Sequence, residues 1–140
     1  MSLRALVVRA GGRLAALPLE HVIETMRPLP LEPWPAAPAF VLGLALVRGA
    51  PAPVVDLARL MGGEAARPTR LVTVRSGAAV VALAVDEVAG VHDLDEATLG
   101  AAPALLDQGP DGPTQALGRL DAELLVVLRA ARLGPEVSLR

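Results

Sequence analysis

The stretch PAFVLGLALVRGAPAPVVDLARLMG, residues 38–62, carries the clearest structural pattern in the chain. It contains two apolar runs, 39–47 and 53–57, which are joined through Arg48 and Gly49. Apolar runs of this length bounded by Gly and Pro are typical of buried strands rather than helices. The stretch therefore predicts a strand, a tight turn, a second strand and a short helical turn at residues 57–61.

Two charged side chains, Arg48 and Asp56, stand within this apolar stretch. Burying an unpaired charge is costly, so each is expected to have a partner or to lie at an edge. Both a capped strand end and a functional group remain open interpretations for each residue.

The composition of the 140 residues fits one domain or two small lobes that share a core. Apolar residues make up 53% of the chain and charged residues 20%, so a sizeable core can form without a cofactor. With one Phe, one Trp and no Tyr, that core must be filled by Val, Leu and Ala. Such side chains suit narrow barrels or closely packed sheets better than an aromatic ligand pocket.

Charge and residue usage exclude several functional classes. A net charge of −2 and the near absence of aromatic rings disfavour nucleic-acid binding. The lack of Cys excludes disulfides, thiolate nucleophiles and Cys-ligated metals. No apolar run approaches the roughly 20 residues of a membrane span, and arginine interrupts the apolar run within residues 1–9 too early for a signal peptide. We expect a cytoplasmic protein without direct membrane insertion.

An internal repeat relates residues 4–22 to residues 70–88 at a constant offset of 66. Seven of the nineteen aligned positions are identical, and several others keep their character. The identical pairs are Arg4/Arg70, Val8/Val74, Arg9/Arg75, Gly11/Gly77, Ala16/Ala82, Leu17/Leu83 and Val22/Val88. Similarity at a fixed offset indicates a repeated structural unit. With two copies, the sequence predicts two similar lobes.

The remaining segments read as short strands separated by turn residues. Residues 3–9 and 13–17 form a hairpin, 19–26 a helical turn or a third strand, and 116–128 a second hairpin. A proline-rich loop at 28–38 and a loop at 102–113 connect these parts. About ten such strands favour all-β barrels or a sandwich.

Candidates for catalysis are few. His21 and His92 are far apart in sequence, and carboxylates that would complete a metal site with them cannot be placed. Asp56 and Asp86 each follow a valine-rich strand and could form a carboxylate pair, although turn capping explains them equally well. We expect no catalytic residues, metal or cofactor. Strand edges and a groove between lobes instead favour docking of another protein, for example an amphipathic helix.

The run from Gly43 through Arg48-Gly49 to Pro53-Val-Val-Asp56-Leu resembles the signature of the CheW family, the coupling adaptors of bacterial chemotaxis. Weaker likeness extends over about residues 3–134. The resemblance implies an all-β fold of two intertwined five-stranded SH3-like barrels with short helical turns. As a single CheW-like domain over 1–140, the chain would have one lobe at about 13–68 and another at about 69–134. Whether the strand at 3–9 is shared between the lobes stays open.

The resemblance also implies a function and a site. The expected function is a non-catalytic adaptor that couples the cytoplasmic tip of chemoreceptors, the methyl-accepting chemotaxis proteins, to the regulatory domain of a CheA-type histidine kinase. Such a protein acts in the cytoplasm at receptor arrays on the inner membrane and has no small-molecule substrate. The implied receptor-binding groove consists of Leu19, Val22, Glu24, Arg48, Leu71 and Val91, with Glu24 and Arg48 forming an ion pair. The implied structural motif residues are Gly43, Gly49, Pro53, Asp56 and Asp86.

Departures from the family pattern leave alternatives open. The family's Asn two residues before the Arg is Leu46 here, and the Asp of its closing Leu-Asp pair is Arg129. One alternative is therefore a divergent relative that binds only the receptor or only the kinase in a specialised pathway. An alternative of another class is a small hydrolase or ligand-binding barrel that uses Asp56, Asp86 and Glu24. An apolar groove would favour the adaptor, and a cavity where carboxylates converge would favour the enzyme.

Overall fold

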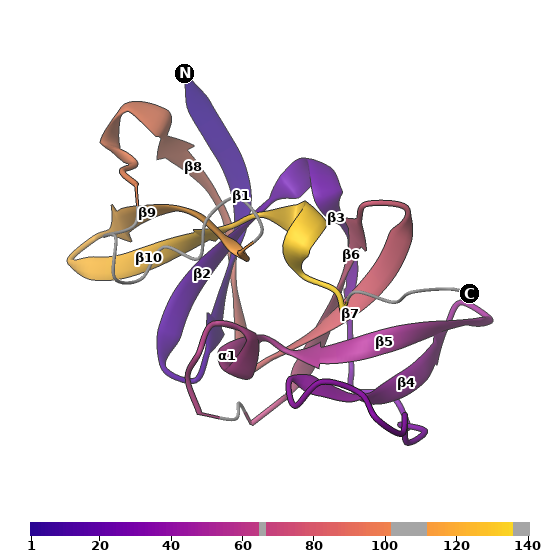
Figure 1. Cartoon of the computed structure of the whole chain (residues 1–140). Helices are drawn as coiled ribbons and strands as arrows, with labels where there is room; N and C mark the ends of the chain where they lie inside the picture. Colours follow the sequence, from indigo (N-terminus) through magenta and orange to yellow (C-terminus); the bar gives the residue numbers. More distant parts are fainter. Residues whose placement is uncertain (65–66, 102–111, 136–140) are drawn as a thin grey trace.

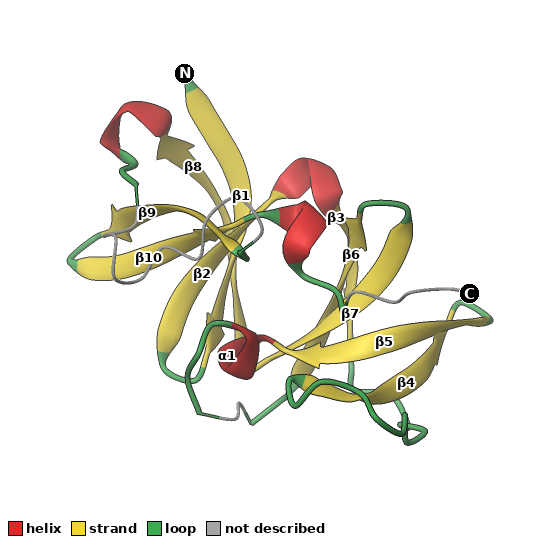
Figure 2. Ribbon diagram, in the orientation of Figure 1, coloured by secondary structure: helices red, strands yellow, loops and turns green. Residues whose placement is uncertain are grey.

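The computed structural model describes residues 1–64, 67–101 and 112–135. Within these ranges the chain forms two five-stranded sheets that lie beside each other (Figures 1 and 2). The first sheet has the order β8-β1-β2-β10-β9 and contains β1 (Ser2–Ala10), β2 (Arg13–Pro18), β8 (Glu87–Asp95), β9 (Thr114–Leu120) and β10 (Glu123–Leu128). The second has the order β3-β6-β7-β5-β4 and contains β3 (Val22–Met26), β4 (Val41–Val47), β5 (Ala50–Asp56), β6 (Arg70–Ser76) and β7 (Ala79–Val85). The described helical segments are single turns: η1 (Leu19–His21), α1 (Leu57–Leu60), η2 (Glu96–Thr98) and η4 (Ala130–Arg132).

The central stretch folds as its pattern predicts. β4 and β5 form an antiparallel hairpin in which Val47 pairs with Ala50, and α1 follows β5 directly. The two turn residues, Arg48 and Gly49, have positive φ angles of 52° and 83°. Positive φ at both central residues defines the type I′ turn, whose twist matches that of the flanking strands. Residues 19–26, for which two interpretations were open, contain both a helical turn and a strand.

The sequence repeat corresponds to a repeat of structure. The offset of 66 residues places Arg4 of β1 on Arg70, the first residue of β6, and Arg13 of β2 on Ala79, the first residue of β7. When each strand of one sheet is replaced by the equivalent strand from the other copy of the repeat, the strand order of the other sheet results. Each sheet also contains one parallel pair, β2 with β10 and β5 with β7. The all-β fold with two five-stranded sheets is therefore confirmed.

The division of the chain between the sheets differs from the expected lobe boundaries. The first sheet takes β1 and β2 from the first copy of the repeat and β8, β9 and β10 from the second. Each sheet therefore takes strands from both sides of the boundary expected between residues 68 and 69. Four strand pairs join one copy to the other: the antiparallel pairs β1–β8 and β3–β6 and the parallel pairs β2–β10 and β5–β7.

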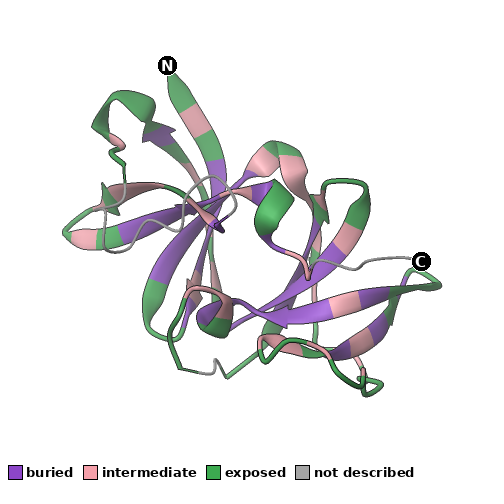
Figure 3. Cartoon of the chain, viewed as in Figure 1, coloured by how far each residue is buried: buried purple, intermediate pink, exposed green. Residues whose placement is uncertain are grey.

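The core is built mainly from Val, Leu and Ala, as the scarcity of aromatic residues requires. One large cluster joins the sheets and includes Val8, Leu17, Val72, Leu83 and Leu128. Smaller clusters fill the opposite face of each sheet. Central strands are consequently buried on both faces, which explains their continuous apolar runs (Figure 3).

Parts of the connecting segments pack on these clusters: Leu29 of the proline-rich loop contacts the smaller cluster of the second sheet, and Phe40 contacts the large one. In the proline-rich loop, Glu32 exchanges two backbone hydrogen bonds with Leu44 of β4, both 2.8 Å long. The loop expected at 102–113 lies outside the described residues except for its last two. In the parts of the chain that the structure describes, no helix has both the length and the apolar character that a membrane crossing requires.

Substitution of Gly43 by Ala is expected to lower the free energy of unfolding by about 1–3 kcal/mol. A Cβ atom at this position would lie 2.6 Å from the carbonyl oxygen of Glu32, so the Glu32–Leu44 bridge would have to open. Urea denaturation would measure the change. Gly100→Ala is the matched control, because its Cβ would meet no atom of the described residues within 4 Å. Equal losses in the two variants would contradict this interpretation.

Candidate functional site

The Glu24–Arg48 ion pair is the centre of the candidate site. The Arg48 guanidinium donates from Nε to Glu24 Oε2 at 2.9 Å and from Nη2 to Glu24 Oε1 at 2.5 Å. This two-pronged geometry is among the strongest that a guanidinium and a carboxylate can form. The predicted proximity of the two residues is confirmed, whereas their role in receptor binding stays a prediction.

The fold brings these residues together from opposite edges of the second sheet. Glu24 lies on the edge strand β3, and Arg48 begins the turn after β4, the other edge strand. Curling of the sheet into a barrel brings such edges toward each other. The Arg48 side chain remains 78% exposed, while that of Glu24 is 25% exposed. The Arg48 guanidinium is therefore accessible to a partner, whereas the Glu24 carboxylate that binds it is partly buried.

A small cavity adjoins the ion pair. Its volume is about 230 Å³. Apart from Glu24, Arg48 and Thr73, its lining is apolar, and comes from Ile23, Val47, Ala50, Pro51, Ala52 and Val80. The cavity therefore offers apolar contacts beside one ion pair, a combination suited to a partner that carries both apolar and charged side chains.

The ion pair makes the stability of the protein dependent on pH. The hydrogen bonds that Arg48 donates to the Glu24 carboxylate lower the pKa of Glu24 and raise the pKa of Arg48. A carboxyl whose pKa is lower in the folded state stabilises the fold above its ordinary pKa of about 4.3, and this contribution disappears as the pH falls through the lowered value.

We therefore expect the loss of unfolding free energy between pH 7 and pH 3 to be smaller in Arg48→Ala than in the unmodified chain. Without the guanidinium, the Glu24 pKa returns toward its ordinary value, so acid removes less stability. Urea denaturation at both pH values would measure the difference. Identical pH dependence in both proteins would show that the pair does not hold the Glu24 pKa down.

The other predicted groove residues are not all brought to this place. Leu19 and Val22 are half-buried and pack on the large core cluster. Leu71 is only 2% exposed and belongs to the core cluster of the second sheet, so its side chain lies beneath the surface. Val91 is 53% exposed but lies on β8 of the first sheet, opposite Leu6. Of the six residues, only Glu24 and Arg48 line the described cavity.

The motif residues have structural roles. Asp56 is 2% exposed, accepts a hydrogen bond from the backbone N–H of Arg59 at 3.3 Å and so caps α1. Asp86 accepts from the backbone N–H of Gly11 at 3.0 Å and of Arg67 at 2.7 Å. Pro53 lies in β5 just before the β5–β7 pairing begins at Val54, as its missing N–H requires. The turn-capping interpretation of both carboxylates is therefore confirmed.

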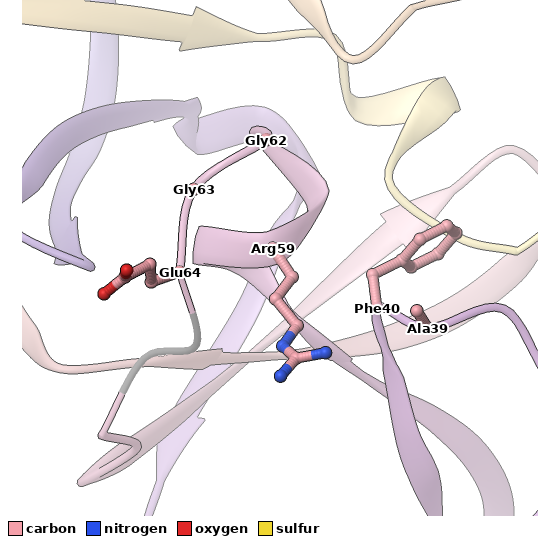
Figure 4. A pocket seen from close by; sticks show the side chains of 6 residues that line it. All are labelled: Ala39, Phe40, Arg59, Gly62, Gly63 and Glu64. Carbon is pink, nitrogen blue, oxygen red and sulfur yellow. The ribbon is translucent and has the colours of Figure 1, made fainter.

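Two further cavities are present among the described residues, and one of them shares Pro51 with the cavity beside the ion pair. One of about 540 Å³ lies beside α1 and is lined by Ala39, Phe40, Arg59, Gly62, Gly63 and Glu64 (Figure 4). The other, about 490 Å³, is lined by Leu29, Pro30, Glu32, Leu44, Ala45, Leu46 and Pro51. Each of the three cavities contains a single carboxylate, so Asp56, Asp86 and Glu24 do not converge. Among the described residues, no three His, Cys, Asp or Glu side chains form a group that could hold a metal.

Sequence reasoning missed Thr73, which is fully buried and lines the cavity beside the ion pair. One signal was available, because Thr73 is the one polar residue in the apolar run 71–74. The apolar lining residues Ile23 and Val80 carried no comparable signal, since exposed apolar side chains resemble those of the core in sequence.

Comparison with known proteins identifies the family. A model described as the CheW-like domain matches residues 4–137. Protein FrzA of Myxococcus xanthus is 32% identical over 120 residues, which cover 81% of this chain and 75% of FrzA. Chemotaxis protein CheW of Rhizobium meliloti (strain 1021) is 32% identical over 98 residues, which cover 68% of this chain and 63% of that protein. The crystal structure of the scaffolding protein TtCheW from Thermoanaerobacter tengcongensis has a TM-score of 0.79 at 21% identity and covers 92% of this chain and 90% of its own.

The family model covers nearly the whole chain, so the chain belongs to the CheW-like family, and the TtCheW structure shares its fold. It is a non-catalytic adaptor of chemotaxis signalling, as the members of that family are. The hydrolase alternative is not favoured.

Proposed function

We propose that the chain couples the cytoplasmic tip of a chemoreceptor to the regulatory domain of a CheA-type histidine kinase. Family membership supports the adaptor role in general. The observation that supports receptor binding is the Glu24–Arg48 pair at the edge of an apolar cavity. Such an adaptor would work in the cytoplasm at receptor arrays.

The chemistry of the cavity fits a helix that is apolar on one face and carries an acidic residue beside it. Apolar side chains of such a helix would contact Ile23 and Val80, and the carboxylate would meet the exposed Arg48 guanidinium. Partner helices recognised in grooves use spaced apolar anchors in this way. Arg is also among the residues that most often dominate binding energy at interfaces.

Pairwise titrations would test the proposal. The purified chain would be titrated with a receptor signalling tip and, separately, with the regulatory domain of a CheA-type kinase from the same organism. The chain contains 13 arginines and no lysine, so amine coupling would attach it through its N-terminus, at the start of β1 in the first sheet. The candidate site in the second sheet would remain free.

Binding of both partners is expected. Arg48→Ala should lower the affinity for the receptor tip by about tenfold or more. Binding of one partner alone would instead indicate a divergent relative. Of the departures from the family pattern, Leu46 in place of the family's Asn is the one most accessible to a partner, because its exposed fraction is 68%. Binding of neither partner would contradict the proposed function.

A further inference from the structure

Thr73, in the middle of β6, makes two side-chain hydrogen bonds to the backbone of one residue on the neighbouring strand. Its side-chain Oγ1 accepts from the backbone N–H of Glu24 and donates to the backbone carbonyl of Glu24, both at 3.2 Å. The hydroxyl therefore satisfies both backbone polar groups of one residue on the neighbouring strand. Thr73 is completely buried, so water does not compete for these bonds.

The bonds lie at a β-bulge between β3 and β6. Val22 pairs with Val74 and Glu24 with Thr73, so Ile23 is an extra residue on β3. A regular ladder would pair Glu24 with Val72 instead. A bulge shifts the register by one residue, and such a shift moves the following side chains to the other face of the sheet.

The bulge decides which way Glu24 faces. Val72 and Val74 belong to the large core cluster between the sheets, whereas Leu71, two residues from Thr73, belongs to the cluster on the opposite face. Residues directly opposite each other on paired strands share a face. Without the bulge, Glu24 would face the apolar core between the sheets. With it, Glu24 faces the cavity and Arg48.

We propose that Thr73 is the positioning residue of this site: its hydroxyl holds the Ile23 bulge and so aims Glu24 at Arg48. The inference rests on the proposed function for its biological use, but the geometry that it explains exists in the free protein. Thr73 would act on a partner only through Glu24 and Arg48.

Thr73→Val tests the inference, because Val keeps the shape and strand preference of Thr but lacks the hydroxyl. Thr73→Ser keeps the hydroxyl. The Glu24 carboxyl pKa, followed by carbon NMR during a pH titration of the free chain, is the readout. We expect a lowered pKa in the unmodified chain and in Thr73→Ser, and a return toward the ordinary value of about 4.3 in Thr73→Val.

Val72→Ala is the matched control for simple destabilisation. It removes core contacts from the adjacent position of β6, so it should lower the melting temperature and leave the Glu24 pKa unchanged. An unchanged Glu24 pKa in Thr73→Val would overturn the proposal, as would an equal rise in Val72→Ala.

Two further measurements distinguish failure of the Thr73 proposal from failure of the proposed function. Receptor-tip binding should weaken about tenfold in Thr73→Val and recover in Thr73→Ser. If the unmodified chain binds no receptor, the proposed function fails, whereas the NMR result still decides the role of Thr73. If Thr73→Val does not fold, hydrogen exchange of the Glu24 amide in the unmodified chain decides, because an unprotected amide there would overturn the hydrogen bond itself.

Discussion

Replacement of Leu83 by Ala is expected to lower the free energy of unfolding by about 2–5 kcal/mol, the range for deleting a buried Leu side chain. Leu83 has no solvent exposure, lies on the central strand β7 and belongs to the cluster that joins the sheets. With so few aromatic side chains in the chain, few large groups can shift to fill the space. A loss of this size is a large fraction of the stability of an ordinary domain.

Urea denaturation would measure this loss. Leu124→Ala is the matched control, because Leu124 is 54% exposed and should change stability by less than about 0.5 kcal/mol. A small loss in Leu83→Ala, similar to that of the control, would contradict the shared core. Separate unfolding of the two sheets in the unmodified chain would contradict it as well.

Reversal of the charge at Arg48 is expected to have the largest effect on receptor binding. Arg48→Glu places a second carboxylate beside Glu24, where the unmodified chain has a two-pronged ion pair. Like charges at this distance repel, so the side chains should separate and the edge of the cavity should change shape. We expect receptor affinity to fall by more than about a hundredfold, while kinase binding remains.

The double variant Glu24→Arg with Arg48→Glu separates two roles of the pair. If the pair acts only by holding the cavity in shape, the exchanged pair should restore most of the receptor affinity. If the Arg48 guanidinium itself meets an acidic residue of the receptor, affinity should stay low. Full affinity of the single Arg48→Glu variant would show that this face does not contact the receptor. Titration at two salt concentrations would add a check, because contacts between exposed charges weaken as salt increases.

Much of the fold could be predicted because its determinants are local. The β4–β5 hairpin follows from two apolar runs around Arg48-Gly49, a turn pair whose positive φ angles close a short hairpin. The repeat at an offset of 66 predicted two equivalent units. The exchange of strands between them was not predictable from local pattern, because it depends on pairing between distant segments. These pairs are β1–β8, β3–β6, β2–β10 and β5–β7.

The candidate site likewise has one part that could be predicted from the sequence and another that could not. A charge in an apolar stretch needs a partner, and this requirement predicted a paired or edge position for Arg48. The resemblance to the CheW family, not the residue pattern, pointed to Glu24 as that partner. The sequence could not predict on which face of their sheets Leu71 and Val91 lie, because the alternation of side chains along a strand does not show which face is covered by other parts of the protein. Leu71 lies in the core and Val91 on the other sheet. The bulge at Ile23 and the two bonds of Thr73 also carry little sequence signal, because a single Thr in a strand is common.

Bridging of receptor and kinase is the central claim, and formation of a three-part complex tests it most directly. Sedimentation of a receptor signalling-tip assembly would be followed with the kinase regulatory domain, with and without the chain. The account predicts that the kinase domain sediments with the receptor when the chain is present and remains in solution when it is absent or carries Arg48→Glu. Equal sedimentation of the kinase domain with and without the chain would contradict the adaptor role.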